Sequence, residues 1–493
     1  MSDWSAQEPT GTQSCESVKN RFFALVDINH PPVDQALRVL LVADDKHPAN
    51  VVTDHIEALL ATSKHKVELV NPIHSPPLSN LSSDRYDALI IHYSIYTLGS
   101  YFLSPEWAYR ITCFDGLKVQ IIQDEYRDID QMKAQMRCLG VRVVFSSLAL
   151  TQSRQVYDGP FMEDIEVFSC LPGYFSERIL NLPKKPLHER EYDIIYRGRD
   201  LPWTTGKHAR EKSELADTFT SWVAEKGLKL NVHSDESERL YGSDWDHFIQ
   251  NGRAMIGTEG GATIFDFDGK IQSQYDNFRS SSPDTDLERY WTEHLQRHEG
   301  KIVHKTITPK IFEAIAAKTA LVLFPAEWSG ILQPDRHYIP LERDGSNILE
   351  VTTKVRDDKF LKDLVERTYA DIATKPELSF KFYVDKIDRV IAKGVPLGLQ
   401  KPTEKYFQER LMLLDFNYDQ TTQKATDLQQ KVNELHHEVF VSGQNLEGSQ
   451  NQLSATQTER DTLQNQLTEL EKLTIRNAVK KLLRILSRLL RSR

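Results

Sequence analysis

The stretch ITPKIFEAIAAKTALVLFPAEWSGILQPDRHYIPL, residues 307–341, decides the fold of this chain. Pro309 suits the first turn of a helix, where the missing N–H of proline costs no hydrogen bond. The apolar residues of KIFEAIA then recur at helical spacing, which predicts a helix with one buried face. The apolar run 320–324 ends at a proline and predicts a strand covered on both faces. We therefore expect Glu313 in the first turn of a helix that faces the carboxyl end of a parallel sheet, where α/β proteins bind ligands.

Around this stretch, short apolar runs typical of buried strands alternate with amphipathic runs typical of helices. The strand-like runs are 37–42, 66–70, 86–91, 117–122, 141–145, 166–168, 192–196, 228–232 and 254–256. The helix-like runs include 51–62, 211–226, 245–250, 357–373 and 379–392. We expect the last two of these helices to close the second domain. Such alternation predicts parallel, doubly wound sheets.

A proline- and charge-rich connector, NLPKKPLHERE, separates the two series of runs and marks a domain boundary. We therefore predict an N-terminal Rossmann-like domain over 36–185 and a C-terminal one over 190–393. Within the second domain, the polar, Ser- and Asp-rich residues 266–300 predict an insertion with one helix near 286–297. The loop after the first strand, ADDKHPAN, lacks the glycines of a GxGxxG fingerprint, which argues against an NAD enzyme.

The composition bounds the class of protein. A length of 493 residues exceeds what one hydrophobic core supports, so two or three units are expected. A net charge of −10 offers no broad surface for nucleic acid. The four cysteines show no CxxC spacing, which argues against a zinc site or a disulfide framework and fits a reducing compartment. Because residues 1–35 lack a signal-peptide pattern and no apolar run could span a bilayer, we expect a flexible arm there and a cytoplasmic protein.

The composition changes sharply after a linker expected at 394–418. Residues 419–473 place Leu, Val and Ala at two heptad positions among Gln, Glu and Asn, which predicts a coiled coil and a homo-oligomer, with a single solvated helix as the alternative. Residues 474–493 carry seven Arg and Lys and no acid beside an aliphatic stripe. This pattern is typical of a basic amphipathic helix on an anionic membrane surface, although the stripe could instead extend the coiled coil or bind a partner helix.

The segment FEAIAAKTALVLFP, followed by HYIPL, resembles the C-terminal segment of nucleotide-sugar glycosyltransferases of the two-Rossmann (GT-B) kind. It is closest to the "glycosyl transferases group 1", or family 4, branch. The resemblance implies that Glu313 accepts hydrogen bonds from the ribose hydroxyls of the donor, and a carboxylate can accept two vicinal hydroxyls at once. The chain departs from the family at two places: Lys305 stands where family 4 members carry an acid, and Thr319 where a glycine is usual.

A diphosphate site is expected at the ends of the second-domain strands. Glycine after the strand 192–196 permits close backbone approach to a ligand, although it could equally serve a plain turn. The start of the helix at residue 309 offers free N–H groups that favour an anion. The candidate residues for the diphosphate are Arg197, Gly198, Arg199, Lys207, Thr308 and Lys310.

Four further residues are candidates for sugar contacts or for catalysis. Glu259 lies in the GTEGG loop and could contact sugar hydroxyls, or belong to a plain flexible turn. The resemblance places the donor phosphates near the loop that here contains Gly330. His92 and Asp124 follow strands of the first domain, and either could be the general base of an inverting enzyme. A retaining enzyme needs no such base, and each residue could instead be structural.

The residues and the resemblance together predict a hexosyltransferase that uses a UDP- or GDP-sugar. We expect no obligatory metal or other cofactor, because basic side chains and helix N-termini can neutralise the leaving diphosphate. The expected acceptor is a glycan or lipid-linked glycan of surface polysaccharide biosynthesis, at the inner face of a membrane. Two alternatives stay open: a GT-B-fold scaffold without turnover, motivated by Lys305 and Thr319, and a nucleotide-sugar epimerase, which would need a second acidic site.

Overall fold

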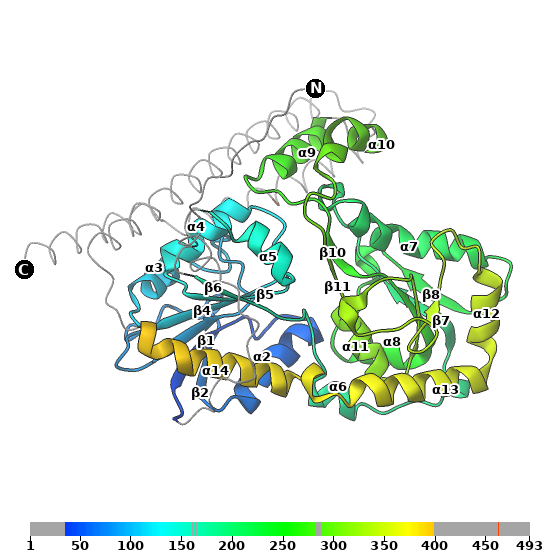
Figure 1. Cartoon of the computed structure of the whole chain (residues 1–493), viewed down its shortest axis with the longest axis horizontal. Helices are drawn as coiled ribbons and strands as arrows, with labels where there is room; N and C mark the ends of the chain where they lie inside the picture. Colours follow the sequence, from blue (N-terminus) through cyan, green and yellow to red (C-terminus); the bar gives the residue numbers. More distant parts are fainter. Residues whose placement is uncertain (1–34, 160–161, 163–164, 282–286, 399–461, 463–493) are drawn as a thin grey trace, which may run out of the picture.

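The computed structural model describes residues 35–159, 162, 165–281, 287–398 and 462. These residues form two α/β lobes side by side, each built around a parallel sheet (Figure 1). The predicted architecture of two Rossmann-like units is confirmed. The predicted coiled coil and basic helix, nearly all of the N-terminal arm and most of the linker lie outside the described residues. Within the described part of the chain, no helix is both long and apolar enough to cross a bilayer.

The first sheet contains six parallel strands in the order β2-β1-β3-β4-β5-β6. Their bounds are β1 (Arg38–Val42), β2 (Lys66–Val70), β3 (Ala88–Ile91), β4 (Leu117–Ile122), β5 (Val143–Ser146) and β6 (Glu166–Ser169). Both faces are covered, which is why a central strand such as β3 is apolar and buried along its whole length. One face is covered by α3 (Pro105–Cys113), α4 (Ile129–Leu139) and α5 (Leu150–Val156), and the other by α2 (Asn50–Thr62) and α14 (Phe380–Gly398).

The second sheet contains five parallel strands in the order β13-β12-β9-β7-β8. Their bounds are β7 (Tyr192–Arg197), β8 (Leu230–His233), β9 (Gly252–Gly257), β12 (Ala320–Leu323) and β13 (Ile339–Pro340). One face is covered by α7 (Lys207–Val223), α12 (Ile348–Arg356) and α13 (Asp358–Thr368), and the other by α8 (Gly242–Asn251) and α11 (Pro309–Ala316). The helix and the first strand predicted within residues 307–341 are α11 and β12.

The junction between α11 and β12 explains the polar residue at the start of the strand. The left-handed turn that ends the helix is made by Lys318, with φ of 53°. A glycine is therefore not required at the next position, which is Thr319. Thr319 is buried, and its hydroxyl donates to the carbonyl of Ile249 at 2.8 Å and accepts from Nη1 of Arg190 at 2.7 Å. Local packing therefore accounts for the threonine at this position.

The last described helix lies elsewhere than expected. We expected residues 379–392 to close the second domain, but α14 packs against the first sheet (Figure 1). Its apolar face includes Tyr383, Ile387 and Ile391, all of which are buried beside α2. The helical period of the sequence predicts a buried face but cannot show which of two sheets that face covers. Through α14 the described chain returns to its first domain.

The insertion in the second domain also differs from its prediction. An antiparallel pair, β10 (Gly260–Ala262) with β11 (His304–Thr306), forms its base. Its tip holds two helices, α9 (Lys270–Ser281) and α10 (Leu287–Tyr290), where we expected one (Figure 1). The helix predicted near 286–297 is present as α10 and the π-helical turn Trp291–Leu295 that follows it, and α9 is the helix that was not predicted. Aromatic side chains pack the two helices together, with the ring centroids of Tyr275 and Tyr290 5.7 Å apart. We refer to residues 260–306 as the arm.

The arm reaches the first domain. Asp266 donates its backbone N–H to the carbonyl of Tyr126 at 2.9 Å. In return, the N–H groups of Ile129 and Asp130, at the start of α4, donate to the carbonyls of Asp266 and Phe267 at 3.3 and 2.9 Å. The arm is therefore a second connection between the domains, distant from α14 in the sequence.

A third connection is a partly buried ion bridge at the domain junction. Arg178, in α6 (Glu177–Asn181), donates from Nε to Oδ1 of Asp54 on α2 at 2.6 Å and from Nη1 to Oδ2 of Asp246 on α8 at 2.6 Å. Asn50 donates to the other oxygen of Asp246 at 3.1 Å. One guanidinium thus holds a carboxylate from each domain.

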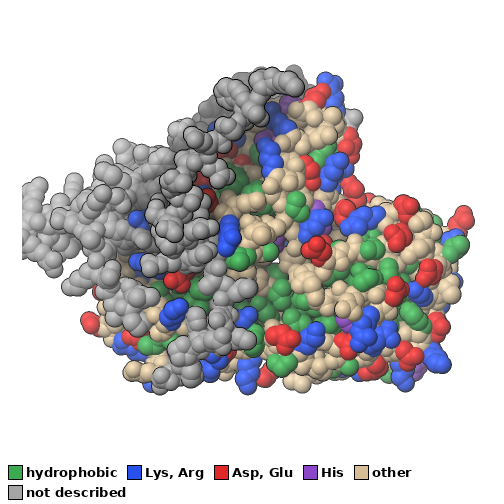
Figure 2. Space-filling model, in the orientation of Figure 1, with side chains coloured by type: hydrophobic (Ala, Val, Ile, Leu, Met, Phe, Trp, Pro, Cys, Tyr) green, Lys and Arg blue, Asp and Glu red, His purple; other side chains and the backbone are tan. Residues whose placement is uncertain are grey.

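Figure 2 shows how charged and hydrophobic side chains are distributed on one face of the molecule. On this face, Lys and Arg are interspersed with Asp and Glu over the outer surface of the second lobe. Hydrophobic side chains gather where the two lobes meet.

The place of α14 predicts where a mutation in it acts. Ile387 is fully buried against the first sheet, so Ile387→Ala should destabilise the protein by about 2 to 5 kcal/mol through lost burial and a cavity. Hydrogen exchange should show faster exchange in β1, β3 and β4. The exposed Lys381 on the same helix is the control, and Lys381→Ala should leave exchange unchanged. Faster exchange confined to the second sheet would contradict this packing.

Candidate functional site

A cavity of about 320 Å³ lies between the two domains. The first domain contributes residues 49–51, where the loop after β1 enters α2. The second domain contributes the turn 197–199 after β7, residues 239–241 in the loop that follows β8, and the start of α11 at 308–310. The segments 49–51, 197–199 and 239–241 follow the carboxyl ends of β1, β7 and β8, and open α/β sheets bind ligands at that edge.

Basic side chains dominate the charged lining of the cavity. They are Arg197, Arg199, Lys212, Arg239 and Lys310. Among the described residues that line the cavity, Glu313 is the single acid. A concave site with this excess of positive charge favours a small anion such as a diphosphate.

Two helix N-termini border the same cavity. The N-cap residues of α2 and α11, Ala49 and Thr308, make no side-chain capping hydrogen bond, and neither helix has an acid in its first turn. N–H groups at such helix starts are left for an anion. The hydroxyl of Thr308 is also buried without a partner in the described part of the chain. Both domains therefore offer donors to one ligand.

Gly198 is required by its neighbours. A Cβ at this position would lie 2.4 Å from Oγ of Ser234 and 2.8 Å from the ring of Tyr196. Its N–H donates to the carbonyl of His233 at 2.8 Å, which continues the β7–β8 ladder. The glycine therefore has a structural reason of its own, and the turn that it makes presents Arg199 to the cavity.

Arg197 and Lys310 are held by contacts on the second-domain wall. The guanidinium of Arg197 lies over the ring of Phe248, 4.3 Å from its centroid, and donates to the carbonyl of Glu238 at 2.7 Å. Lys310 donates to the carbonyl of Arg197 at 2.9 Å and lies 4.7 Å from the ring centroid of Tyr196. Burial lowers the pKa of Lys310 well below its usual value. An arriving anion would restore the charged form.

Glu313 lies deeper in its helix than expected. Since α11 begins at Pro309, Glu313 is its fifth residue and falls after the first turn. Its Oε2 accepts a hydrogen bond from Nε1 of Trp245 at 3.0 Å. Burial raises the pKa of Glu313 to about 7, the bond from Trp245 opposes this rise, and the charge of Asp54 adds to it. The carboxyl group therefore changes its charge near neutral pH.

In the first domain, the structure favours Asp124 over His92 as a group that can reach a substrate. Asp124 is exposed after β4 and takes a left-handed backbone conformation, with φ of 61°, which is uncommon outside glycine. Burial lowers the pKa of Lys212, across the cavity, and the charge of Asp124 opposes that shift. Asp124 is therefore near the cation that lines the opposite wall.

His92 is enclosed. It has no exposed surface, and its ring nitrogens bond to Nδ1 of His55 at 2.8 Å and to Oγ of Ser94 at 2.9 Å. Burial lowers the pKa of both histidines, which keeps the pair neutral. In this structure His92 offers no atom to an acceptor hydroxyl, so the geometry supports the structural interpretation. The position of His92 after a strand correctly placed it at the carboxyl edge of the sheet, but the sequence did not show that its side chain is buried.

Three more predicted residues lie outside the cavity lining. Lys207 starts α7, and its Nζ lies 5.7 Å from the ring centroid of Trp291 in the arm. Glu259 is buried, and its Oε1 accepts the N–H of Trp328 at 2.7 Å, so it supports the loop after β12. Gly330 is exposed in that loop with φ of 74°. The structure therefore does not bring these three together with the basic cluster.

Several lining residues escaped the sequence analysis. Lys212, Arg239, Tyr241 and Trp245 line the cavity, yet none lies in a recognisable motif. Lys212 belongs to an amphipathic helix, and the sequence pattern predicts that the charged side chains of such a helix face solvent. The segment RLYGSDW, residues 239–245, precedes and starts a helix and could have been marked only by its aromatic residues.

The described residues include no group of three or more His, Cys, Asp or Glu that could hold a metal ion. A DxD element, Asp266-Phe267-Asp268, lies in the arm. Oδ2 of Asp266 accepts the N–H of Gln272 at 2.9 Å, and Asp268 pairs with Lys270 at 2.5 Å. These contacts give the element a structural role at the start of α9.

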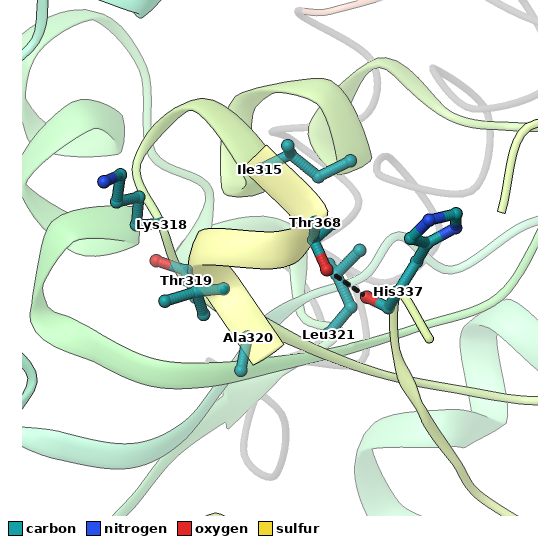
Figure 3. Close-up of a pocket in the computed structure, with 8 residues that line it drawn as sticks. Ile315, Lys318, Thr319, Ala320, Leu321, His337 and Thr368 are labelled. Carbon is teal, nitrogen blue, oxygen red and sulfur yellow. Dashed lines mark hydrogen bonds between the residues drawn. The ribbon is translucent and has the colours of Figure 1, made fainter. Parts of the chain in front are cut away.

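The end of α11 opposite Glu313 is tightly packed (Figure 3). The small pocket there, beside Thr319 and Thr368, leaves no room for a water molecule. The hydroxyl of Thr368 donates to the carbonyl of His337 at 3.0 Å, and the ring of His337 bonds to Asp371 at 3.2 Å. This packing fixes the helix that carries Glu313, which gives the carboxylate a defined position.

No protein-family model matches the chain, and no curated protein matches it. Among solved structures it is similar to an α-glucosyltransferase in complex with UDP-glucose and DNA containing an abasic site, at 11% identity and a TM-score of 0.46, over 73% of this chain and 100% of that one. It is similar to the DNA-modifying enzyme β-glucosyltransferase at 11% identity and a TM-score of 0.40, over 74% and 100% of the two chains. It is similar to TarM at 12% identity and a TM-score of 0.33. That match covers 62% of this chain and 54% of TarM.

The raised pKa of Glu313 predicts a pH-dependent cost to stability. With a folded pKa of about 7 against an ordinary 4.5, ionisation of Glu313 destabilises the fold progressively between these values, and the full cost is present above pH 7. Glu313→Gln removes this cost. The variant should melt about 3 °C higher than the parent at pH 8.5 and at the same temperature at pH 5. An equal difference at both pH values in thermal unfolding would show that the carboxyl charge is not responsible.

Proposed function

We propose that this protein is a glycosyltransferase that binds a nucleoside diphosphate sugar between its two domains. The observation that carries the proposal is the composition of the interdomain cavity. It combines five basic side chains, two helix N-termini without capping side chains and one carboxylate. The cations and N–H groups suit a diphosphate, and the carboxylate of Glu313 suits a pair of sugar hydroxyls.

In the proposed reaction, a hydroxyl oxygen of the acceptor forms a bond to the anomeric carbon of the donor sugar. The bond between that carbon and the diphosphate oxygen breaks, and the nucleoside diphosphate leaves with the electron pair. Positive charge from Arg199, Lys212 and Arg239 stabilises the negative charge on the leaving group. In an inverting enzyme, Asp124 takes the proton of the acceptor hydroxyl, because it is exposed near the cavity.

The finer parts of the proposal concern the acceptor and the place of reaction. We propose a glycan or lipid-linked glycan of a surface polysaccharide, with a coiled coil at 419–473 joining copies of the chain and the basic residues 474–493 docking on the inner face of a membrane. The support is the heptad pattern and the seven cations of the tail. Nucleotide binding without turnover is the second candidate, motivated by Lys305, which is exposed on β11 at a place where an acid was expected.

The proposal predicts selective binding of nucleoside diphosphates. UDP or GDP, tested by thermal shift and calorimetry, should bind the parent and raise its melting temperature, whereas uridine and guanosine should bind more weakly. Arg199→Ala should weaken binding of the diphosphate about tenfold and leave nucleoside binding unchanged, because one exposed cation is lost from the cavity. Lys359→Ala, at an exposed site on α13, serves as the charge-matched control.

The outcomes separate the candidates. Binding followed by slow hydrolysis of the matching UDP- or GDP-sugar supports a transferase. Binding of the nucleotide with neither hydrolysis nor transfer to any acceptor supports the binding module. The absence of binding to all nucleotides would refute both, and interconversion of one UDP-sugar into another would identify an epimerase.

The proposed membrane docking predicts the effect of removing residues 474–493. A chain without them should lose binding to vesicles that contain phosphatidylglycerol, in a sedimentation assay at low salt, because seven cations are removed. Its affinity for the nucleotide should not change. Neutral phosphatidylcholine vesicles are the control. If the shortened chain sediments as the parent does, the tail is not the membrane-binding segment.

A further inference from the structure

We propose that Trp245 is a positioning residue of this site: its indole N–H holds the carboxylate of Glu313 in the orientation and charge in which it receives two hydroxyls of a ribose. This inference rests on the proposed function for its ligand. Its structural part concerns the free protein and can be tested without any ligand.

The indole of Trp245 is itself held in place. It stacks on Phe248, with ring centroids 5.6 Å apart and an interplanar angle of 30°. Phe248 is buried, and the guanidinium of Arg197 lies 4.3 Å from the centroid of its ring. The three side chains form a layered wall, in which the indole has little freedom to turn away from its partner.

The hydrogen bond from Trp245 divides the two oxygens of Glu313 between two tasks. Oε2 accepts the indole N–H at 3.0 Å. For Oε1, the described residues offer no hydrogen-bond partner, and Glu313 lines the cavity. Since an indole donates and cannot accept, it favours the ionised carboxylate over the protonated group in this geometry. Oε1 and the remaining lone pairs are then open to a ligand.

The other charged groups around Glu313 do not hold it in the ionised form. Asp54 and Asp246 favour the protonated carboxyl group through like-charge repulsion. Arg178 opposes them, but its guanidinium is engaged with those same two aspartates at 2.6 Å. The amino group of Lys310 lies near enough to be affected by Glu313, yet burial lowers its pKa and its hydrogen bond goes to a backbone carbonyl. Among the described residues, Trp245 therefore supplies the direct hydrogen bond to this carboxylate.

The substitution Trp245→Phe tests this role, because it keeps an aromatic ring on Phe248 and removes the N–H. In the free protein, NMR titration of the labelled Glu313 carboxyl should give a midpoint about one pH unit higher in the variant than in the parent. Calorimetry with UDP or GDP should then show about fivefold weaker binding at pH 7 and recovery to within about twofold of the parent at pH 9. Trp222→Phe, on α7, is the matched control and should change neither quantity.

The readouts distinguish positioning from packing. An unchanged carboxyl midpoint, or an equal loss of affinity at pH 7 and pH 9, would overturn the inference. In a Glu313→Gln background, Trp245→Phe should no longer alter the pH dependence of binding, and a persisting effect would also contradict it. If the Glu313 midpoint shifts in Trp245→Phe but the parent binds no nucleotide, the contact between Trp245 and Glu313 is supported and the proposed function is refuted. If Trp245→Phe does not fold, Trp245→His keeps a ring N–H donor, and a titration of Glu313 in that variant should give the parent midpoint, whereas a midpoint raised by a full unit would contradict the inference.

Discussion

The guanidinium of Arg178 lies between Asp54 and Asp246 and joins the two domains next to the cavity. The two carboxylates belong to α2 and α8, and both helices also contribute residues to the cavity lining. Two carboxylates that meet at a domain junction repel one another unless a cation lies between them. A partly buried pair of this kind adds little net stability, but the loss of one member leaves an uncompensated charge. The bridge therefore specifies the relative placement of the domains more than it strengthens either one.

The same bridge shapes the chemistry next to it. Asp246 lies in α8 directly after Trp245, whose indole bonds to Glu313. The acids that join the domains thus also raise the pKa of the carboxylate in the cavity. A group whose ionisation destabilises the folded protein is typical of a binding site. Contacts with a bound ligand can offset that unfavourable free energy. The packed far end of α11 keeps this strained group in place.

The sequence predicted the local parts of this arrangement and missed those that depend on distant contacts. The pattern from Pro309 through β12 is decided by neighbours in the chain, so both elements and the place of Glu313 near the cavity could be derived. The target of α14 could not, because its apolar face fits either sheet. Lys212 and Trp245 belong to ordinary amphipathic helices and become part of a site only when the domains meet. His92 occupied the expected strand end, but periodicity does not show that His55 would cover it.

A net charge of −10 is compatible with the anion binding that we propose. The cations that matter lie in one concave site, and the surface in Figure 2 mixes both signs. Over distances beyond about 8 Å, salt screens the mean charge of the protein, whereas a ligand inside the cavity meets its five basic groups directly. A cavity of about 320 Å³ has room for a diphosphate. Under the proposed function, its positive field would hold the phosphates, and the single carboxylate of the lining, Glu313, would receive hydroxyl groups of the same ligand.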